Sequence, residues 1–458
     1  MVAAARSGLT RRGLLQRVSA AVAAPIAAAC AARISSPTAP PSATGPASAT
    51  GRASPTAQRI GGSLSILQWS HVVPAFDAYL DQWTAQWGAR NGVAVRIDRI
   101  PYADLPARIA VEATAKSGHD LVANFSSGLA AVYQPSLVDI SDVCERAAST
   151  YGGWLPAGEA IGKVNGSWYG FPDYAMPLLS TWRTDLWRSA GFTADHLATW
   201  DDLFDHAARL KAAGTPVGCA MSTSSYAEHT WRSLLWSYGA AEFSSDGTKV
   251  AIDSPETRRV LDLAKALFAN EEPAVTTWTD GDAARYLASG KGSWIYSPLD
   301  AYRATETQAP SIAGQIRLDG PLAGPAASVC STLFTVYGIW KFSRNVEAAR
   351  QFLIDYSDDW QNQMTASVGH NYPLLRSHAQ KPMPILGADP KLDHLQDIGS
   401  FLRIVGYPGP ATAAANDALN RHVVSDLFAS YSTGKLTADS AIAEAARRLG
   451  ESLATFPA

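Results

Sequence analysis

Strand-like and helix-like segments alternate in one part of this chain, and the alternation limits the folds available to it. Residues 63–69, 93–100 and 120–125 are apolar or alternate between apolar and polar, which predicts strands. Between them, residues 76–87 carry large apolar side chains at helical spacing, and residues 104–116 predict a second helix. Strand, helix, strand, helix, strand is typical of a parallel sheet, so we predict an α/β fold.

Polar and aromatic side chains stand at the ends of two of these strands. Trp69, Ser70 and His71 follow one another at the end of the first strand, and Asn124 and Ser126 lie at the end of the third. In open parallel sheets, ligands bind beyond the carboxyl ends of the strands. This rule alone marks these positions as candidates for a binding site.

A second α/β stretch follows. Strand-like residues 168–171 and 178–183 surround Pro172 and Pro177, and Thr199 is a typical N-cap with two acids in the turn after it. The predicted helices of this stretch and of the tail cover residues 200–213, a segment from Ser254 onward, and residues 345–355, 411–428 and 437–453. A chain of 458 residues has room for two or three such units.

Charge is distributed unevenly along the chain. Residues 1–76 contain seven Arg and no Asp or Glu, so the remaining 31 Lys and Arg face all 41 acids from Asp77 onward. An acidic body behind a basic leader is typical of an exported protein. With a net charge of −3, nothing favours a nucleic-acid partner.

The leader has the features of an export signal. Residues 10–15 resemble the twin-arginine signal, although an ordinary signal peptide that carries two Arg fits as well. The apolar stretch that follows, residues 18–30, is shorter than the ~20 residues that a membrane span needs. We therefore predict that residues 1–30 are an export signal and that no transmembrane helix is present.

Cys30 follows three alanines in a pattern that resembles a bacterial lipobox, whose Cys is acylated; an Ala-x-Ala cleavage site is the alternative. Of residues 31–60, 24 are Ala, Pro, Ser, Thr or Gly, which predicts a disordered linker. We expect lipidation at Cys30 and a location in the periplasm or at the outer face of the cytoplasmic membrane. The other cysteines, Cys144, Cys219 and Cys330, are far apart, so we expect separate buried thiols, no metal and no cofactor.

Several short motifs in a characteristic order resemble the extracellular solute-binding proteins of ABC importers, in the cluster that binds sugars. The resemblance covers most of residues 61–453. The segments that carry it are residues 63–69, 165–172, 182–187, 191–192, 199–203, 286–294, 342–349 and 434–441.

The resemblance implies a two-lobed periplasmic-binding-protein fold of type II. Each lobe would hold a mixed, mostly parallel sheet flanked by helices, with a hinge between the lobes. We expect chain crossings near residues 172–177, 297–298 and 332–340. The expected division is residues 61–172 plus 298–340 for lobe 1, and residues 173–297 plus 341–458 for lobe 2 and the C-terminal helices.

The resemblance also implies the function. The protein is expected to capture a sugar or sugar derivative between the lobes and to deliver it, as a monomer, to the permease subunits of an ABC importer. Two alternatives stay open, namely a non-sugar solute such as a glycerol phosphate, and a binding protein that serves a sensor.

The expected site combines strand ends with positions implied by the resemblance. Sugar rings stack on aromatic faces, so Trp69 and Trp231 are predicted platforms, although either ring can instead belong to the core. Tyr174 lies in the expected hinge, and Asn124 and Ser126 can either bond hydroxyls or cap a turn. The full predicted set is Trp69, Ser70, Asn124, Ser126, Tyr174, Trp231, Tyr296 and Thr332.

Catalysis is the competing class of function. Glycoside hydrolysis needs a pair of carboxylates, and the adjacent acids at 201–202, 271–272 and 358–359 fit helix ends or turns instead. No nucleophile-elbow, zinc-protease, P-loop or dinucleotide motif is present in the sequence. We therefore predict a binding protein and not an enzyme.

Overall fold

Two larger β-sheets, together with two sheets of only two strands each, organise residues 60–124 and 126–457, which are the residues that the computed structural model describes. The predictions for the export signal, for lipidation at Cys30 and for the linker up to residue 59 lie outside the described residues.

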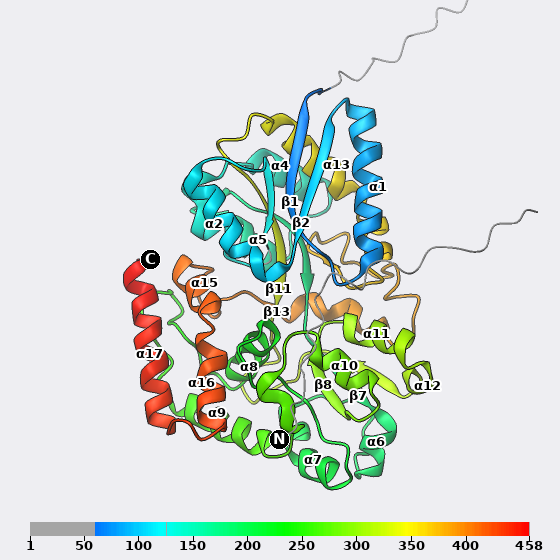
Figure 1. Ribbon diagram of the computed structural model, residues 1–458, viewed down its shortest axis with the longest axis vertical. Coiled ribbons are helices and arrows are strands. Elements are labelled where there is room, and N and C mark those ends of the chain that lie inside the picture. The colour runs from blue at the N-terminus through cyan, green and yellow to red at the C-terminus, as the bar shows by residue number, and fades with distance from the viewer. Residues whose placement is uncertain (1–59, 125, 458) are drawn as a thin grey trace, which may run out of the picture. The chain divides into compact units, whose positions relative to one another are not determined.

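The first sheet has six strands in the order β12-β6-β11-β3-β1-β2. Strand β1 pairs in parallel with β2 and β3, as the alternating sequence pattern predicts (Figure 1). Strand β11 runs antiparallel to both β3 and β6, so the sheet is mixed. The strands are β1 (Ser63–Trp69), β2 (Ala94–Ile100), β3 (Leu121–Asn124), β6 (Phe171–Met176), β11 (Leu333–Ile339) and β12 (Tyr372–Pro373).

Helices bury apolar faces around this sheet. The ring of Trp83 on α1 packs edge-on against Phe352 on α13, with ring centroids 5.3 Å apart, and Trp87 Nε1 donates to Asp355 Oδ2 at 2.7 Å. The helices of this lobe are α1 (Pro74–Asn91), α2 (Leu105–Ala115), α3 (Leu129–Tyr133), α4 (Ser141–Thr150), α5 (Pro156–Gly162), α13 (Val346–Asp358) and α14 (Trp360–Ala366).

The second sheet has three strands in the order β8-β7-β9, namely β8 (Trp294–Ser297), β7 (Leu179–Arg183) and β9 (Ile316–Asp319). Its pairs are antiparallel, whereas a mostly parallel sheet was expected. The path of the chain between these strands explains why they are antiparallel. Strand β7 leads the chain away from the crossing at Pro177, and β8 returns, so that Ser297 lies opposite Leu179.

The second lobe also contains helices, some of which are capped by a local side chain. Thr199 accepts from Asp202 N in a capping box, which confirms the predicted N-cap, and Ser254 accepts from Thr257 N at the start of the predicted helix. The helices are α6 (Thr184–Ser189), α7 (Trp200–Ala212), α8 (Ser225–Ser237), α9 (Pro255–Phe268), α10 (Asp282–Ala288), α11 (Asp300–Gln308) and α12 (Pro310–Ala313).

The structure differs from the expected division of the chain at several elements, among them β6, β9, β12 and α13. Strand β9 falls in residues 298–340, which were assigned to lobe 1, yet it pairs with β7 of the second sheet. Helix α13 falls in residues 341–458, which were assigned to lobe 2, yet it packs on α1 of the first lobe. The expected boundaries followed prolines and motifs, which do not reveal which distant strand or helix a segment contacts.

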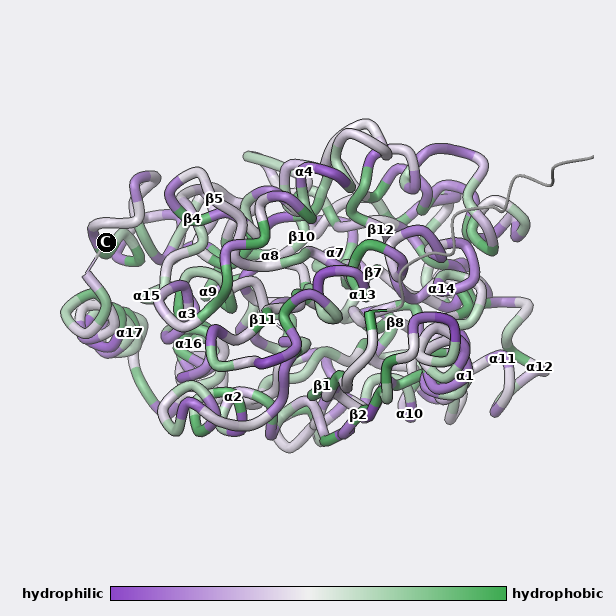
Figure 2. The backbone as a smooth tube through the Cα atoms, turned by 90° about the horizontal axis from the view of Figure 1, so that it is seen from above, coloured by the Kyte–Doolittle hydropathy of each residue, from purple (hydrophilic) through white to green (hydrophobic). Residues whose placement is uncertain are grey.

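The C-terminal segment forms three helices, α15 (Ala413–Asn420), α16 (Val423–Ser432) and α17 (Ala438–Thr455), of which α16 and α17 pack side by side (Figure 1). The sequence predicted one helix over 411–428, but the chain breaks at His422, whose φ is 54°. A left-handed residue ends one helix before the next begins. Helix α17 buries Ala441, Ile442, Ala445 and Leu449, and Figure 2 shows both hydrophobic and hydrophilic residues along it.

Cys144, Cys219 and Cys330 are all free and buried, which confirms the interpretation as separate thiols. Burial raises the pKa of the Cys144 and Cys219 thiols well above the usual range and that of Cys330 to about 11. These thiols are therefore held in the protonated, unreactive form at neutral pH.

Candidate functional site

A cavity of ≈ 650 Å³ lies between segments of the two lobes. Its volume is within the range of small-molecule sites, ~300–1,000 Å³. Its walls come from the start of α2, the end of β3, the start of α8, the loop before α10 and the break between α15 and α16. The lining residues are Tyr102, Ala103, Pro106, Ala107, Asn124, Ser126, Ser222–Ser225, Glu228, His229, Thr276–Asp280, Leu419, Asn420 and His422.

Tyr102 and Asn124 form the first-lobe wall. Pro101 ends strand β2, and Tyr102 begins the short 3-10 turn that leads into α2. Asn124 is the last residue of β3, and its Nδ2 donates to Ser126 Oγ at 3.3 Å. Both positions lie at carboxyl ends of neighbouring or near-neighbouring strands, as expected for ligand sites in such sheets.

Ser126 joins this wall to the C-terminal helices. Its Oγ donates to Asn416 Oδ1 on α15 at 2.7 Å and accepts from Gly128 N at 3.1 Å. Gly128 permits the approach, because a Cβ there would meet the Asn416 side chain at 2.2 Å. The end of β3 and α15 therefore form one side of the cavity together.

The N-terminus of α8 supplies the opposite wall. Ser224 caps the helix by accepting from Ala227 N, and Asp280 Oδ1 accepts from Tyr226 N at 2.8 Å. Burial raises the pKa of Asp280 to about 6, in part opposed by the backbone N–H of Tyr226. Asp280 thus presents a half-buried carboxyl group to the cavity.

Glu228 also lines the cavity, but its oxygens are already engaged. Oε1 accepts from Arg232 Nη2 at 3.1 Å and from Val424 N at 3.2 Å, and Oε2 accepts from Ser425 N at 2.6 Å. Arg232 in turn pairs with the buried Glu242. Glu228 is therefore a fully buried cap on α16.

Trp278 lines the cavity from the loop before α10. Gly218 allows its ring to lie close, because a Cβ at that glycine would stand 2.4 Å from the ring. The ring packs against Tyr286 with centroids 5.1 Å apart, and the carbonyl of Trp278 accepts from Ser222 Oγ. The residue is 7% exposed, so only a small part of it is open to the cavity.

The described lining of the cavity contains no Lys or Arg, the residues that usually neutralise an anion. Burial lowers the pKa of His229 to about 3, so this imidazole is neutral, and its Nδ1 lies 2.8 Å from Ser331 Oγ. Hydroxyl and amide groups of Ser, Thr and Asn make up most of the polar surface instead.

Two of the eight predicted residues, Asn124 and Ser126, lie on this cavity. Trp69 and Tyr174 lie together away from it. Both are buried, and Trp69 Nε1 donates to Tyr174 OH at 3.2 Å. Ser70 is exposed, and its N–H donates to Ile100 O at 2.9 Å, which continues the β1–β2 pairing.

The other three predicted residues lie in the interior of the second lobe and the crossing. Trp231 is 0% exposed and stacks on Phe428, with ring centroids 5.1 Å apart, so its ring belongs to the core and does not face the cavity. Tyr296 packs on Trp200 at 5.4 Å. Thr332 Oγ1 donates to Cys330 O at 2.9 Å.

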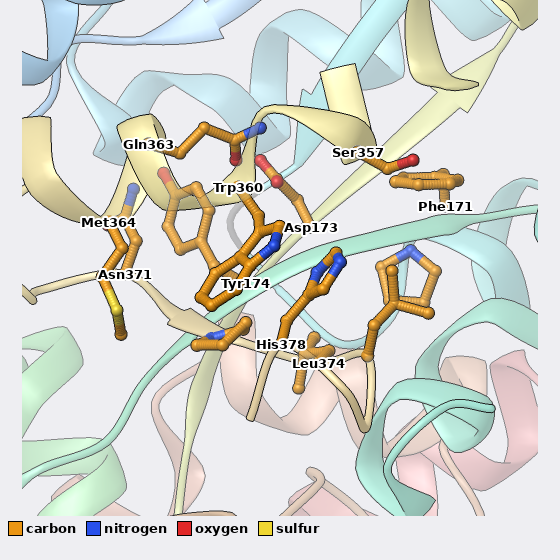
Figure 3. Close-up of a pocket in the computed structure, with 13 residues that line it drawn as sticks. Phe171, Asp173, Tyr174, Ser357, Trp360, Gln363, Met364, Asn371, Leu374 and His378 are labelled. Carbon is orange, nitrogen blue, oxygen red and sulfur yellow. The ribbon is translucent and has the colours of Figure 1, made fainter. Parts of the chain in front are cut away.

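A second, much smaller cavity of ≈ 30 Å³ lies beside β6 (Figure 3). It has room for about one water molecule. Asp173 from β6 lines it, as do Trp360 and His378, whose rings stack 4.6 Å apart. Asp173 Oδ2 is buried without a hydrogen-bond partner among the described residues, and burial raises the pKa of this carboxyl well above its usual range. This space is too small for a sugar.

Sequence reasoning missed Tyr102, Trp278 and Asp280. Tyr102 comes directly after β2, so the strand-end rule that selected Trp69 and Asn124 also applies to it. Trp278 and Asp280 lie in a Thr-rich loop, where an aromatic residue among hydroxyls is the available signal.

Within residues 60–124 and 126–457, no cluster of three or more His, Cys, Asp or Glu side chains is placed to bind a metal ion. Over the same residues, no helix combines the length and the apolar character that crossing a membrane requires.

Two α/β lobes joined by crossing strands, with a solute-sized cavity between them, define a periplasmic binding protein. The family model described as bacterial extracellular solute-binding protein matches residues 82–392. The chain belongs to this family of exported solute-binding proteins.

Individual proteins are similar to this chain in sequence or in fold. A probable ABC transporter-binding protein of Deinococcus radiodurans is 26% identical over 304 residues, which cover 64% of this chain and 69% of that protein. A solute-binding protein of Thermotoga lettingae with bound α-D-tagatose superimposes with a TM-score of 0.72 at 18% identity, over 86% of this chain and 100% of its own. An Arthrobacter chlorophenolicus sugar transporter protein with laminaribiose gives a TM-score of 0.74 at 17% identity, over 85% of this chain and 99% of its own.

Proposed function

We propose that this protein captures a neutral sugar or polyol in the ≈ 650 Å³ cavity and delivers it to the permease of an ABC importer. The observation that carries the proposal is the lining itself, in which the aromatic residues Tyr102 and Trp278 stand among Ser, Thr and Asn residues. Sugars need an aromatic surface for their C–H face and short polar groups for their hydroxyls. The tagatose and laminaribiose in the two structural relatives support the same class of solute.

Capture would proceed by closure of the lobes around the solute. The walls of the cavity come from both lobes, so a bound solute contacts both and favours the closed arrangement by those contacts. The strands that cross between the lobes, among them β6 with β7 and β11, would supply the hinge.

A neutral solute fits the cavity better than a glycerol phosphate. Phosphate is usually held by Arg or Lys, and no described lining residue is either. Arg303 pairs with Glu306 at 2.6 Å and donates to Val368 O at 3.2 Å, away from the cavity.

Binding without catalysis also fits the cavity. Glycoside hydrolysis uses two carboxyl groups. Of the two acids in the lining, Glu228 is committed to Arg232 and the backbone of α16, which leaves Asp280 alone.

We further propose that the protein is a monomer held at the outer face of the membrane by a lipid on Cys30. The lipobox-like residues 27–30 and the Ala/Pro/Ser/Thr-rich residues 31–60 support this proposal. The test is metabolic labelling with a fatty acid, in which Cys30→Ala should abolish incorporation.

Isothermal titration calorimetry with tagatose, laminaribiose, maltose, ribitol, glycerol phosphate and an amino acid tests the solute class. Saturable binding of a sugar or polyol is expected, with none for glycerol phosphate. Binding of only the phosphate or the amino acid would overturn the proposal. Copurification with membrane permease subunits would test the importer role.

A further inference from the structure

A closed ring of contacts holds His229 at the wall of the solute cavity. Ser233 Oγ donates to the carbonyl of His229 at 2.8 Å and accepts from the backbone N–H of Ser331 at 2.9 Å. Ser331 Oγ lies 2.8 Å from His229 Nδ1, which closes the ring. His229 and Ser233 lie one turn apart on α8, whereas Ser331 ends strand β10 (Cys330–Ser331). The imidazole is therefore held both by its own helix and by a strand that is distant in sequence.

This arrangement leaves one nitrogen of the imidazole for a solute. His229 lines the cavity, although only 3% of the residue is exposed. Its Nδ1 is engaged with Ser331, whereas Nε2 has no hydrogen-bond partner among the described residues. Unlike the buried Nε2 of His370, this atom is not completely enclosed by protein. Nε2 is thus the ring nitrogen that a molecule in the cavity can reach.

The hydroxyl of Ser331 decides where the hydrogen of the imidazole lies. Ser331 is 0% exposed, and among the described residues His229 Nδ1 is the only acceptor that its Oγ reaches. If Nδ1 carried the hydrogen, the buried hydroxyl would have no acceptor for its own hydrogen. A buried donor without an acceptor is more costly than an unused lone pair on a hydroxyl. The hydroxyl of Ser331 therefore donates to Nδ1.

A lone pair on Nδ1 places the hydrogen of a neutral ring on Nε2. Burial, and after it the nearby cation of Arg232, lowers the pKa of His229 to about 3, so the ring is neutral. A charged ring would carry a hydrogen on Nε2 as well, so the result for this atom does not depend on the charge. His229 thus offers an N–H group to the cavity.

This N–H differs from most other polar groups of the lining. The Ser and Thr hydroxyls around it can both donate and accept, and the carboxylate of Asp280 accepts. With its hydrogen held on Nε2, His229 can only donate. It therefore requires an oxygen with a lone pair at this point of the solute, such as a hydroxyl or a ring oxygen. An ammonium group has no lone pair to offer it.

We propose that His229 is a specificity-determining residue of the solute site, whose Nε2–H donates to an oxygen of the bound solute. Ser331 is the positioning residue that keeps the hydrogen on Nε2. The contact with a solute rests on the proposed function, whereas the place of the hydrogen does not. The two parts are therefore tested separately.

The place of the hydrogen is tested by nuclear magnetic resonance of the full chain with ¹⁵N-labelled histidine, at neutral pH and without solute. The signals of His229 are assigned by their loss in His229→Gln. Hydrogen on Nε2 and a lone pair on Nδ1 are expected, and in Ser331→Ala the two neutral forms should mix. Ser237→Ala is the matched control, because this buried hydroxyl of α8 donates to Leu234 O and should leave the His229 signals unchanged. Hydrogen on Nδ1 in the wild type would overturn the proposal.

The contact with the solute is tested by calorimetry with tagatose, laminaribiose, maltose and ribitol. Gln places an amide N–H about where the Nε2–H of His229 stands, whereas the shorter Asn reaches only to the position of Nδ1. Both variants should bind more weakly than the wild type, and Kd should be about 10-fold higher for His229→Asn than for His229→Gln. Ser237→Ala should bind as the wild type does.

The outcomes separate the contact from the proposed function. Equal Kd values for His229→Asn and His229→Gln, with both variants folded by circular dichroism, would overturn the contact. If the wild type binds none of the four compounds, the proposed function and the contact both fail. The magnetic resonance result would still decide whether Ser331 keeps the hydrogen on Nε2.

Discussion

Glu228 and Ser425 are joined by a 2.6 Å hydrogen bond from the backbone N–H of Ser425 to Glu228 Oε2. The bond connects the first turn of α8 with the first turn of α16, across 197 residues of sequence. It places a negative charge at the positive end of α16, where His422 has just broken the helix. The C-terminal helices therefore depend on one buried carboxylate of the second lobe.

Removing this carboxylate should destabilise the protein strongly. In Glu228→Ala, buried Arg232 loses a partner and two backbone N–H groups of α16 lose their acceptor. The expected loss in the free energy of unfolding is about 3–5 kcal/mol, measured by urea denaturation. The exposed Glu256→Ala, in the first turn of α9, should cost about 0.5 kcal/mol or less. Equal losses for both variants would show that the cap is unimportant.

Tyr102 and Trp278 should carry more of the solute affinity than Trp231. Tyr102→Ala and Trp278→Ala each remove an aromatic surface from the cavity, so Kd should rise about 10- to 100-fold. Trp231→Ala should leave Kd nearly unchanged but cost about 3–5 kcal/mol of unfolding free energy, because its ring is in the core. Calorimetry and denaturation on the three variants separate the two roles. A large loss of affinity in Trp231→Ala alone would restore the original sequence prediction.

Asp280 should make stability depend on pH near neutrality. Burial raises the pKa of Asp280 to about 6, above the value of ~3.9 for the unfolded chain. A carboxyl with a raised pKa favours folding below its unfolded value, and that contribution is lost as the pH rises through 6. Asp280→Asn keeps the acceptor for Tyr226 N, so it should gain up to about 3 kcal/mol on the wild type between pH 4 and 8. A gain that does not change with pH would refute the assignment.

Asp173, in the first lobe, should also make the stability of the protein depend on pH. Burial raises the pKa of its carboxyl well above the usual range, so ionisation opposes folding as the pH rises. Asp173→Asn should match the wild type near pH 4 and exceed it at pH 8 by about 1–3 kcal/mol, measured by urea denaturation. The exposed Asp104→Asn should behave as the wild type at both values. A variant less stable than the wild type at pH 8 would show that the charged form is needed.

Local rules predicted the elements of this fold well. Strand β1 was predicted with the bounds that the structure has, and the caps at Thr199 and Ser254 follow from side chains that bond within three residues. The break at His422 escaped notice because apolar residues continue on both sides of it. A left-handed backbone at a non-glycine residue leaves no mark in hydrophobic periodicity.

Local sequence rules predicted only part of the candidate site. The strand-end rule found Asn124, and it applies equally to Tyr102, which was not considered. It also selected Trp69, whose ring turns into the interior and bonds Tyr174. A rule that finds the end of a strand does not say on which side of the sheet a ring will lie. The walls from α8 and α15 depend on contacts between residues almost 200 or more positions apart, such as Ser126 with Asn416.

The three buried thiols have a practical consequence. Because Cys144, Cys219 and Cys330 are buried and protonated, a thiol-reactive dye should not label them in the folded protein. A cysteine introduced at the exposed Thr276, on the rim of the cavity, would then be the preferred attachment point in the folded body. The natural protein could thus become a fluorescent reporter of its own solute by a single substitution.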